Sequence, residues 1–343
     1  MHKATAIFLA GFLLLTGCSK QTATPAEPST RDLFAMDTYM NLKVWSPDGD
    51  ALLERAADRI DALECAFSVT LSDSDISRVN AAHGVPTQVS ADTAAVLAKA
   101  LEIGQESDGA LDISVYPVTR AWGFTTHTQQ IPDANELSEL LKNVDYSRIS
   151  LDGETVTVPD GMEIDIGALA KGYTSDALVA MFRDAGVQSA IVSLGGNVQA
   201  LGTKPDGSDW KVGIVDPIDP TRNMCVLQIH DKAVITSGNY ERYFEENGVR
   251  YHHIMDSADG YPADNGLISV TVVGDSGLNC DALSTALFVE GTEKAIEHWK
   301  RAGDFEMVLV AEDTHTHILY TEGLADSFEL LADNYPAEVI SRE

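Results

Sequence analysis

Residues 164–172 read Ile-Asp-Ile-Gly-Ala-Leu-Ala-Lys-Gly, a strand-like end that passes through a glycine into a helix with a lysine in its first turn. Free amide groups and the positive end of the helix dipole favour a phosphate at such a start, and Lys171 adds a full positive charge. The residue order is not that of a Walker loop. The segment predicts an anion site, with a purely structural helix start as the alternative.

Residues 279–285, Asn-Cys-Asp-Ala-Leu-Ser-Thr, open another helix and place Asp281 and Thr285 on one face at positions i and i+4. A carboxylate and a hydroxyl are hard oxygen donors suited to Mg²⁺ or Ca²⁺. A main-chain carbonyl, waters and substrate phosphates could complete the coordination. The alternative is that Asp281 only favours the helix start and that Thr285 is buried.

Two adjacent histidines, His252 and His253, lie in the apparent strand 251–255. Neighbouring residues of a strand face opposite sides, so one histidine can face a site while the other packs elsewhere. A neutral imidazole can take a proton from a hydroxyl nucleophile near pH 7. The alternative is an ordinary packed or exposed histidine.

The strands and helices that must position these residues come in blocks along the chain and do not alternate strictly. Apolar residues at helical spacing predict helices over 47–67 and from Ala91, where Ser90 is placed as the cap, and a further helix over 168–185. A hairpin is expected at 149–158, around Asp152 and Gly153. Strands are expected at 190–192, 198–201, 211–215, 225–230, 233–236, 251–255, 268–273, 306–311 and 317–321, with helices near 282–289 and 292–301. This order predicts an α+β fold with mostly antiparallel sheets and packed helices.

The amino terminus has the pattern of a lipoprotein signal. Lys3 precedes an apolar run over residues 4–15, and Leu15-Thr16-Gly17-Cys18 follows at once. The run is too short to span the ~30 Å of bilayer hydrocarbon. We therefore expect a signal peptide over residues 1–17, lipidation of Cys18, a polar tether over 18–30, and one catalytic domain over 31–343.

Composition excludes some classes of partner. The formal net charge is -30, so the protein repels polyanions and nucleic-acid binding is disfavoured. A small anionic ligand then needs positive charge within its own site. Cys65, Cys225 and Cys280 are widely spaced and predict no zinc site. They could form at most one disulfide, and small buried thiols are the favoured alternative.

In their order along the chain, these segments resemble the FAD:protein FMN transferase family, the ApbE-type lipoproteins. The resemblance extends from Phe34 to Gly291. It rests on Asp-Ile-Gly-Ala-Leu-Ala-Lys-Gly, Ser-Leu-Gly-Gly-Asn, Thr-Ser-Gly-Asn-Tyr-Glu-Arg, His-His-Ile and Asp-Ala-Leu-Ser-Thr-Ala. Five ordered matches together with a lipobox are much more specific than any single one.

The resemblance implies a set of site residues. It implies that Mg²⁺ is held by the main-chain oxygen of Ala168, the Asp281 carboxylate and the Thr285 hydroxyl, and that His253 is the base. It also implies that the following residues lie against FAD: Met36, Ala110, Leu111, Asp112, Asp165, Lys171 and Ile254. The reading of the residues agrees, because a diphosphate in so acidic a protein needs Lys171 and a divalent cation.

The implied activity is transfer of FMN from FAD to a threonine or serine hydroxyl of an acceptor protein, with release of AMP. Acceptors would be proteins of membrane or periplasmic redox complexes. The enzyme would be lipid-anchored on the periplasmic side of the cell membrane, at the inner membrane by family habit or at the outer one. The alternatives are a Mg²⁺-dependent FAD pyrophosphatase and a non-catalytic FAD-binding lipoprotein.

The chain departs from the family pattern at three places. Residues 256–262 read Asp-Ser-Ala-Asp-Gly-Tyr-Pro, where the family usually has Asp-Pro-x-Thr-Gly-Tyr-Pro, which puts the rigidity of this loop in question. Thr70 stands where many members have an aromatic residue against the flavin, so ring stacking is weaker here or comes from elsewhere. Asn239 replaces the more usual aspartate, with no consequence that we can derive.

Overall fold

The computed structural model describes residues 27–126 and 128–342. The helices are α1 (Gly49–Phe67), α2 (Asp75–Asn80), α3 (Ala91–Glu106), α4 (Tyr116–Ala121), α5 (Ala134–Leu140), α6 (Gly167–Asp184) and α7 (Gly277–Ala302). The strands are β1 (Ser29–Ala35), β2 (Thr38–Val44), β3 (Thr87–Gln88), β4 (Ser150–Asp152), β5 (Thr155–Thr157), β6 (Ser189–Leu194), β7 (Asn197–Gly202), β8 (Trp210–Val215), β9 (Asn223–Ile229), β10 (Ala233–Gly238), β11 (Tyr243–Glu246), β12 (Val249–His252), β13 (Leu267–Gly274), β14 (Glu306–Glu312), β15 (Thr316–Thr321), β16 (Phe328–Leu330) and β17 (Ala337–Ile340).

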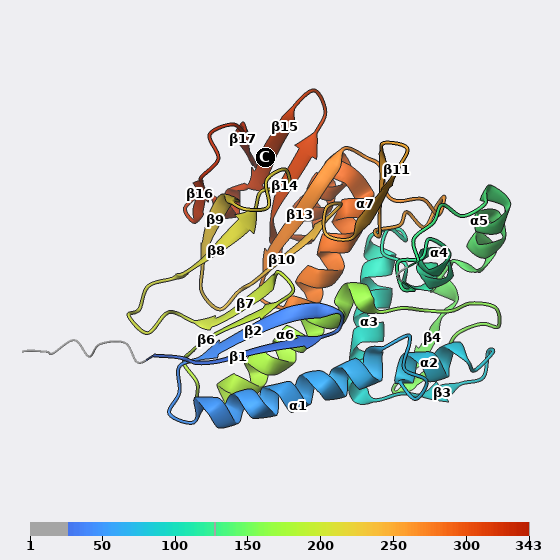
Figure 1. The fold of residues 1–343 in the computed structure, drawn as a ribbon, viewed down its shortest axis with the longest axis horizontal. Coiled ribbons are helices and arrows are strands. Elements are labelled where there is room, and N and C mark those ends of the chain that lie inside the picture. The colour runs from blue at the N-terminus through green and yellow to red at the C-terminus, as the bar shows by residue number, and fades with distance from the viewer. Residues whose placement is uncertain (1–26, 127, 343) are drawn as a thin grey trace, which may run out of the picture.

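A nine-stranded sheet in the order β1-β2-β6-β7-β10-β13-β14-β15-β17 runs through the molecule (Figure 1). Every neighbouring pair in it is antiparallel except β15 and β17. The predicted α+β fold with mostly antiparallel sheets is therefore confirmed. Strands from both ends of the described chain belong to this one sheet.

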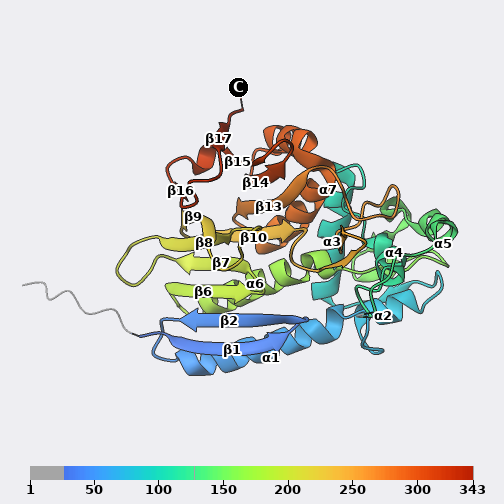
Figure 2. The same ribbon diagram turned by 45° about the horizontal axis from the view of Figure 1, so that its top comes forward.

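The two faces of the sheet are covered by different elements (Figures 1 and 2). Helices α1 and α6 pack under the β2 and β6 end, and α3 and α7 pack under β10, β13 and β14. The small sheet β16-β9-β8 covers the opposite face, where Trp210, Val212 and Leu227 meet Val234, Val308 and Val310. The fold is therefore three layers thick, and the beginnings of α6 and α7 lie on the helical side.

Several predicted elements are confirmed with small shifts. Ser90 caps α3, because its hydroxyl accepts the Thr93 N–H, and the hairpin β4–β5 forms as expected, with its turn at Gly153 and Glu154, one residue later than predicted. The two helices predicted near 282–289 and 292–301 form one element, α7, which is broken at Gly291 by a φ of 79° and a ψ of 171°. Only a glycine adopts this conformation readily, and it separates the predicted pair.

Three boundaries were wrong. Strand β1 begins at Ser29, so the last two residues of the predicted tether belong to the sheet, where Ser29 pairs with Val44. The strand expected over 251–255 ends at His252, and only one further bond of the ladder, from His253 N–H to the Arg242 carbonyl, extends the pairing with β11. Strand β10 runs two residues past Thr236, to Gly238.

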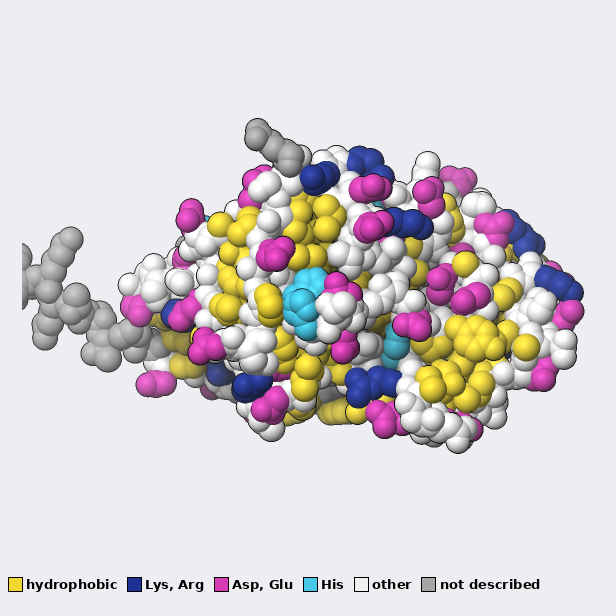
Figure 3. Space-filling view, turned by 90° about the horizontal axis from the view of Figure 1, so that it is seen from above, with side chains coloured by type: hydrophobic (Ala, Val, Ile, Leu, Met, Phe, Trp, Pro, Cys, Tyr) yellow, Lys and Arg dark blue, Asp and Glu magenta, His cyan; other side chains and the backbone are white. Residues whose placement is uncertain are grey.

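The described cysteines form no disulfide: Cys225 and Cys280 are buried, as expected, while Cys65 is exposed. The predicted signal peptide and Cys18 lie outside the described residues. None of the helices in the described part of the chain is both long enough and apolar enough to span a bilayer. Acidic side chains are scattered over the face seen in Figure 3, and the basic ones stand apart from one another.

Candidate functional site

The first turn of α6 contributes Ala168 and Lys171 to a deep pocket. No side chain caps this helix, but its amides are mostly used. Gly167 N–H donates to Asp165 Oδ1 at 2.9 Å, and the amides of Leu169 and Ala170 both donate to the Ile166 carbonyl. The expectation of an array of free amides is therefore wrong, because only the Ala168 N–H lacks a partner among the described residues. Lys171 remains the main positive group.

Asp281 joins the beginnings of α6 and α7. Its Oδ2 accepts the Gly172 N–H at 2.7 Å, and its Oδ1 accepts from Asn197 Nδ2 at 2.9 Å. In a regular α-helix the Gly172 N–H would bond the Ala168 carbonyl, four residues back. The Gly172 amide donates to Asp281 instead, so Asp281 lies beside the turn of α6 that begins with Ala168. The Ala168 carbonyl then has lone-pair capacity for a ligand.

Two glycines permit this close approach. A Cβ on Gly172 would lie 2.2 Å from the Gly277 oxygen and 2.6 Å from Asp281 Cβ. A Cβ on Gly277 would lie 2.6 Å from the Gly172 oxygen. Any larger residue at either position would push the two helix starts apart, so these glycines set the position of Asp281.

Asp176, which sequence reasoning missed, fixes the start of α7. Its carboxylate accepts the amides of Gly277 and Leu278 at 2.7 and 2.9 Å, and the Ser276 hydroxyl at 2.7 Å. An aspartate in the middle of a helix gives no signal of such a distant cap. The contact lies 100 residues away along the chain and appears only in the fold.

Thr285 lies one turn after Asp281 and lines the same pocket. Its hydroxyl is 3.4 Å from Ser237 Oγ, which is 2.8 Å from Ser284 Oγ. Ser284 in turn donates to the Asp281 main-chain oxygen at 2.9 Å. The predicted donors Ala168, Asp281 and Thr285 therefore share one wall of hard oxygen atoms.

His253 faces the pocket, whereas His252 packs edge-on against Phe288 outside it. The Nδ1 of His253 lies 3.2 Å from the Arg242 carbonyl, which can only accept, so Nδ1 carries the proton. Its Nε2 then keeps a free lone pair. Burial first, and then the charges of Arg242 and Lys171, lower the pKa of His253 to about 3, so the ring is neutral.

The remaining pocket wall comes from Ala110, Leu111, Asp112 and Ile254. The Asp112 carboxylate is occupied within its own loop, where it accepts from the Ser114 amide and hydroxyl and from the Tyr146 amide. This segment therefore offers its backbone and apolar surface to a ligand.

The pocket carries more acid than base. Burial raises the pKa of Asp281 and of Asp165. Glu241 is exposed as a whole residue, but desolvation of its carboxyl in the pocket wall raises its pKa to about 7, which the Asp281 charge reinforces and Lys171 opposes. No ion pair within the described residues neutralises Lys171, Asp281 or Glu241. Closely placed acids with raised pKa values are where a cation binds most favourably.

The fit to a metal ion rests on mixed donors. The described residues hold no group of three or more His, Cys, Asp or Glu side chains able to bind a metal. The wall offers one carboxylate, one hydroxyl and one carbonyl instead, which suits Mg²⁺ because that ion keeps several waters and is often completed by substrate phosphates. Glu241, which sequence reasoning did not single out, adds a further carboxylate to those of Asp112, Asp165 and Asp281 in the pocket.

Met36 is the one predicted FAD neighbour that does not line the pocket. It forms, with Asp37, a two-residue turn between β1 and β2 in which both residues have positive φ, 50° and 57°. The Met36 N–H donates to Glu64 Oε1 at 2.8 Å, and its sulfur accepts from Thr174 Oγ1 at 3.6 Å. The turn holds a conformation that non-glycine residues rarely adopt.

The departures from the family pattern have local explanations. The 256–262 loop is well bonded: Ser257 Oγ donates to the Gly109 carbonyl at 2.8 Å, and Trp122 Nε1 donates to the Gly260 carbonyl at 2.8 Å. These hydrogen bonds to two other segments hold the loop in place. Thr70 is exposed and does not line the pocket, while the buried ring of Tyr116 does.

Comparisons with known proteins identify the class of enzyme first. The chain is 34% identical over 283 residues to a FAD:protein FMN transferase of Klebsiella pneumoniae, covering 81% of this chain and 87% of that protein. It is 35% identical over 288 residues to one from Treponema pallidum, covering 78% and 80%. The predicted enzyme class, a flavin transferase, is confirmed by these relatives.

The family follows from a second finding, because the model of the ApbE family matches residues 36–309. The chain belongs to the ApbE family. Its structure is similar to the ApbE protein of Thermotoga maritima, with a TM-score of 0.81, 30% identity, and coverage of 87% of this chain and 98% of that one. It is also similar to the flavin transferase ApbE of Vibrio cholerae, with a TM-score of 0.81, 26% identity, and coverage of 88% and 100%.

Proposed function

We propose that this protein transfers FMN from FAD to a threonine or serine hydroxyl of an acceptor protein and releases AMP, in a Mg²⁺-dependent reaction. One observation carries the proposal: Asp281, held by the Gly172 amide at the start of α6, lines the same pocket as Ala168, Lys171 and His253. A diphosphate needs positive charge, and this is where the molecule can supply it.

The reaction is an in-line displacement. The acceptor hydroxyl oxygen attacks the FMN-side phosphorus of FAD, the new O–P bond forms, and the bond from that phosphorus to the oxygen shared with AMP breaks. AMP leaves with that oxygen. Lys171 stabilises the charge that develops on the phosphate oxygens, and the pocket contributes by holding nucleophile and phosphorus in line.

His253 accepts the proton of the attacking hydroxyl at Nε2, its free ring nitrogen. The Nδ1–H bond to the Arg242 carbonyl keeps the ring in this tautomer. Because the pKa of His253 is lowered, its ring is unprotonated when FAD enters the pocket. The two negative charges of the diphosphate offset Arg242 and Lys171 and so raise the basicity of the ring in the complex.

The Ala168 carbonyl, Asp281 and Thr285 would hold Mg²⁺, which when bound supplies positive charge against the phosphate oxygens. Leu111, Asp165 and Ile254 line the same pocket and would contact FAD. The backbone of 110–112 is held for this role by the Asp112 carboxylate.

The test uses the purified protein with FAD, Mg²⁺ and a purified flavin-carrying domain of a membrane redox complex. Transfer yields a fluorescent acceptor band in a denaturing gel and one AMP per flavin attached. Rapid free FMN with no labelled acceptor would instead show the FAD pyrophosphatase. FAD binding without metal and without AMP release would show a non-catalytic flavin-binding protein.

We also propose that the chain is anchored by lipid on Cys18 and works on the periplasmic side of the cell membrane. The support is the sequence Leu15-Thr16-Gly17-Cys18 after a short apolar run. The test is the membrane fraction: Cys18→Ala should move the protein out of the membranes and abolish incorporation of labelled palmitate. Equal membrane content of Cys18→Ala and wild type would refute the anchor.

A further inference from the structure

A second hollow, here called the side groove, joins the pocket along one wall. The two share Lys171, Thr236, Glu241 and His253. The side groove continues away from them between the β1–β2 turn, the β6–β7 turn and strand β8. Its other lining residues are Asp37, Thr38, Gly195, Gly196, Val198, Gly213, Ile214, Val215, Tyr240 and Arg242.

The two hollows differ in what they can hold. None of Leu111, Asp165 and Ile254, which the FAD site is expected to use, lines the side groove. An in-line displacement requires the nucleophile to approach opposite the leaving group. With FAD in the pocket, the side groove is a second route to His253, and the second substrate of the proposed reaction is a polypeptide.

Strand β8 borders the side groove and is an edge strand. It pairs only with β9, which pairs on its other side with β16. Gln228 of β9 donates its N–H to Ser327, just before β16. Because the bonding side alternates along an antiparallel strand, the even-numbered residues of β9 bond toward β16 and the odd-numbered ones toward β8.

The register then shows which groups of β8 are free. The odd-numbered residues of β9 are paired with Trp210, Val212 and Ile214. Lys211 and Gly213 therefore direct their N–H and C=O groups away from β9. Both residues are exposed, and Gly213 lines the side groove. An open row of backbone donors and acceptors is a template for an added strand.

The opposite wall of the groove has few side chains. Gly195 and Gly196 form the β6–β7 turn with φ of 60° and 95°, and the Cβ direction of Gly196 meets nothing within 4 Å. Asp37 and Arg242 form an ion pair of 3.3 Å across the rim. A chain lying between β8 and this turn meets mostly backbone.

We propose that the acceptor protein docks by adding an extended segment to the free edge of β8, bonding to Gly213 and Lys211, so that its hydroxyl residue reaches His253 through the side groove. This inference rests on the proposed function and names how its second substrate binds.

The test replaces Lys211 by proline, which removes an outward N–H and places a ring on the free edge without breaking the pairing to β9. Lys211→Gln is the matched control, since it loses the same charge but keeps the N–H. We expect Lys211→Pro to lower kcat/KM for the acceptor domain about tenfold or more. FAD affinity and slow FAD hydrolysis without acceptor should stay unchanged, and Lys211→Gln should behave as wild type.

Equal transfer rates for Lys211→Pro and Lys211→Gln would overturn the docking proposal and leave the proposed function intact. No labelling of acceptor by wild type would instead count against the proposed function. If Lys211→Pro fails to fold, as judged by its melting temperature, Val215→Trp blocks the groove from the same strand. Its control is Val339→Trp, at an exposed valine of the edge strand β17; equal transfer by these two variants would likewise refute the proposal.

Discussion

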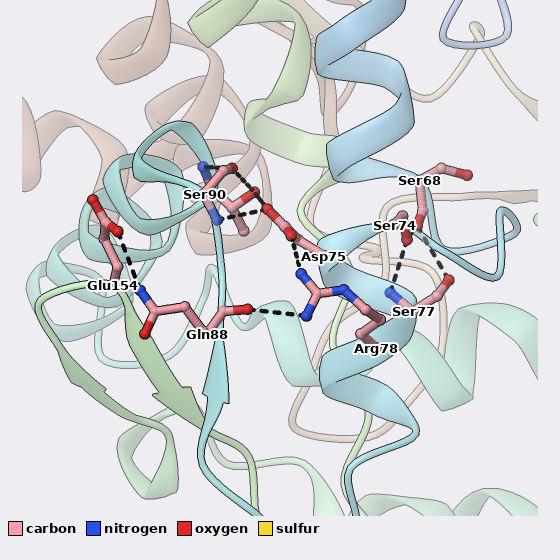
Figure 4. A network of polar contacts seen from close by, with 9 residues as sticks. Ser68, Ser74, Asp75, Ser77, Arg78, Gln88, Ser90 and Glu154 are labelled. Carbon is pink, nitrogen blue, oxygen red and sulfur yellow. Dashed lines mark hydrogen bonds and ion pairs between the residues drawn. The ribbon is translucent and has the colours of Figure 1, made fainter.

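Two buried aspartates, Asp75 and Asp281, meet opposite surroundings in the same molecule. Asp75 begins α2 and accepts from Arg78, from the Ser90 amide at 2.8 Å and from the Thr93 hydroxyl at 2.6 Å (Figure 4). Burial would raise its pKa, but these bonds outweigh burial and hold the pKa below its usual value. Asp281 also accepts two bonds, yet burial prevails and its pKa is raised.

Asp75 is a carboxylate whose charge is balanced by groups of the protein, whereas the charge of Asp281 is not balanced. Around Asp75, Arg78 also donates to the Gln88 carbonyl at 3.0 Å, so acid and base cancel inside the protein. At Asp281 the cation that opposes burial is Lys171, which also acts on Glu241 in the same pocket. Carboxylates with too little positive charge nearby lower the stability of the fold, and a bound cation would restore that stability.

The largest effect expected is that of Asp281→Asn on transfer. The change keeps the shape and removes the charge, so we expect the transfer rate to fall about 10³-fold. Loss of the buried acid raises the melting temperature, but the new NH₂ group meets one of the two N–H donors, so we expect little net change in the melting temperature. Flavin fluorescence on the acceptor and thermal unfolding measure the two quantities. A rate within tenfold of wild type would contradict the assignment of Asp281.

The next effect concerns the histidine pair. His253→Ala should lower the transfer rate about 10²-fold without changing FAD affinity, because it removes the base and no expected FAD contact. His252→Ala is the control: it should lower stability through lost packing against Phe288 and keep the rate per folded molecule. Equal rate losses in both variants would show that His253 acts only through structure.

Asp75→Asn should reverse the pattern of Asp281→Asn. Removing the charge leaves Arg78 without its partner, and we expect the free energy of unfolding to fall by about 2 kcal/mol. Transfer per folded molecule should stay at the wild-type level. Urea unfolding monitored by Trp fluorescence gives the loss, and a variant as stable as wild type would show that the network in Figure 4 contributes little.

The smallest effect is a pH dependence set by Glu241. Its folded pKa of about 7 lies above the ordinary 4.5, so its protonated form stabilises the fold below pH 4.5, and that contribution is lost as pH rises to about 7. With EDTA present, the melting temperature should fall between pH 5 and pH 8, and less so in Glu241→Gln.

Glu246→Gln, at an exposed glutamate of β11, is the control for that experiment. Mg²⁺ should restore the melting temperature at pH 8 in wild type, because a bound cation favours the ionised carboxylates. Asp75, with its lowered pKa, contributes in the opposite range: its stabilisation is present above about pH 4 and is lost in stronger acid. An identical pH profile in wild type and Glu241→Gln would refute the role of Glu241.

Local patterns in the sequence were enough for much of this molecule. The helical spacing of Leu52, Ile60 and Leu63, the Ser90 cap and the β4–β5 turn each depend on neighbours within one element. Lys171, His253 and Asp281 could be predicted as one site only through the ordered motifs of the family. The three side chains line one pocket, and their roles are predictions.

What could not be predicted depends on contacts between distant segments. Asp176 caps a helix 100 residues later, and the free edge of β8 exists because β8 joins a separate sheet. Met36 was placed against FAD by resemblance, but its sulfur and amide bond to Thr174 and Glu64 beside the pocket. Hydrophobic periodicity carries no information about such pairings.

The turn at Met36 and Asp37 has a consequence for substitutions at the rim of the side groove. Two-residue hairpins with positive φ at both positions are most comfortable with Asn-Gly, so this hairpin keeps its shape through Glu64, Thr174 and Arg242. Replacing both residues by Asn-Gly would relax the backbone of this turn and would also remove the Asp37–Arg242 ion pair. The two effects act in opposite directions on the rim of the side groove.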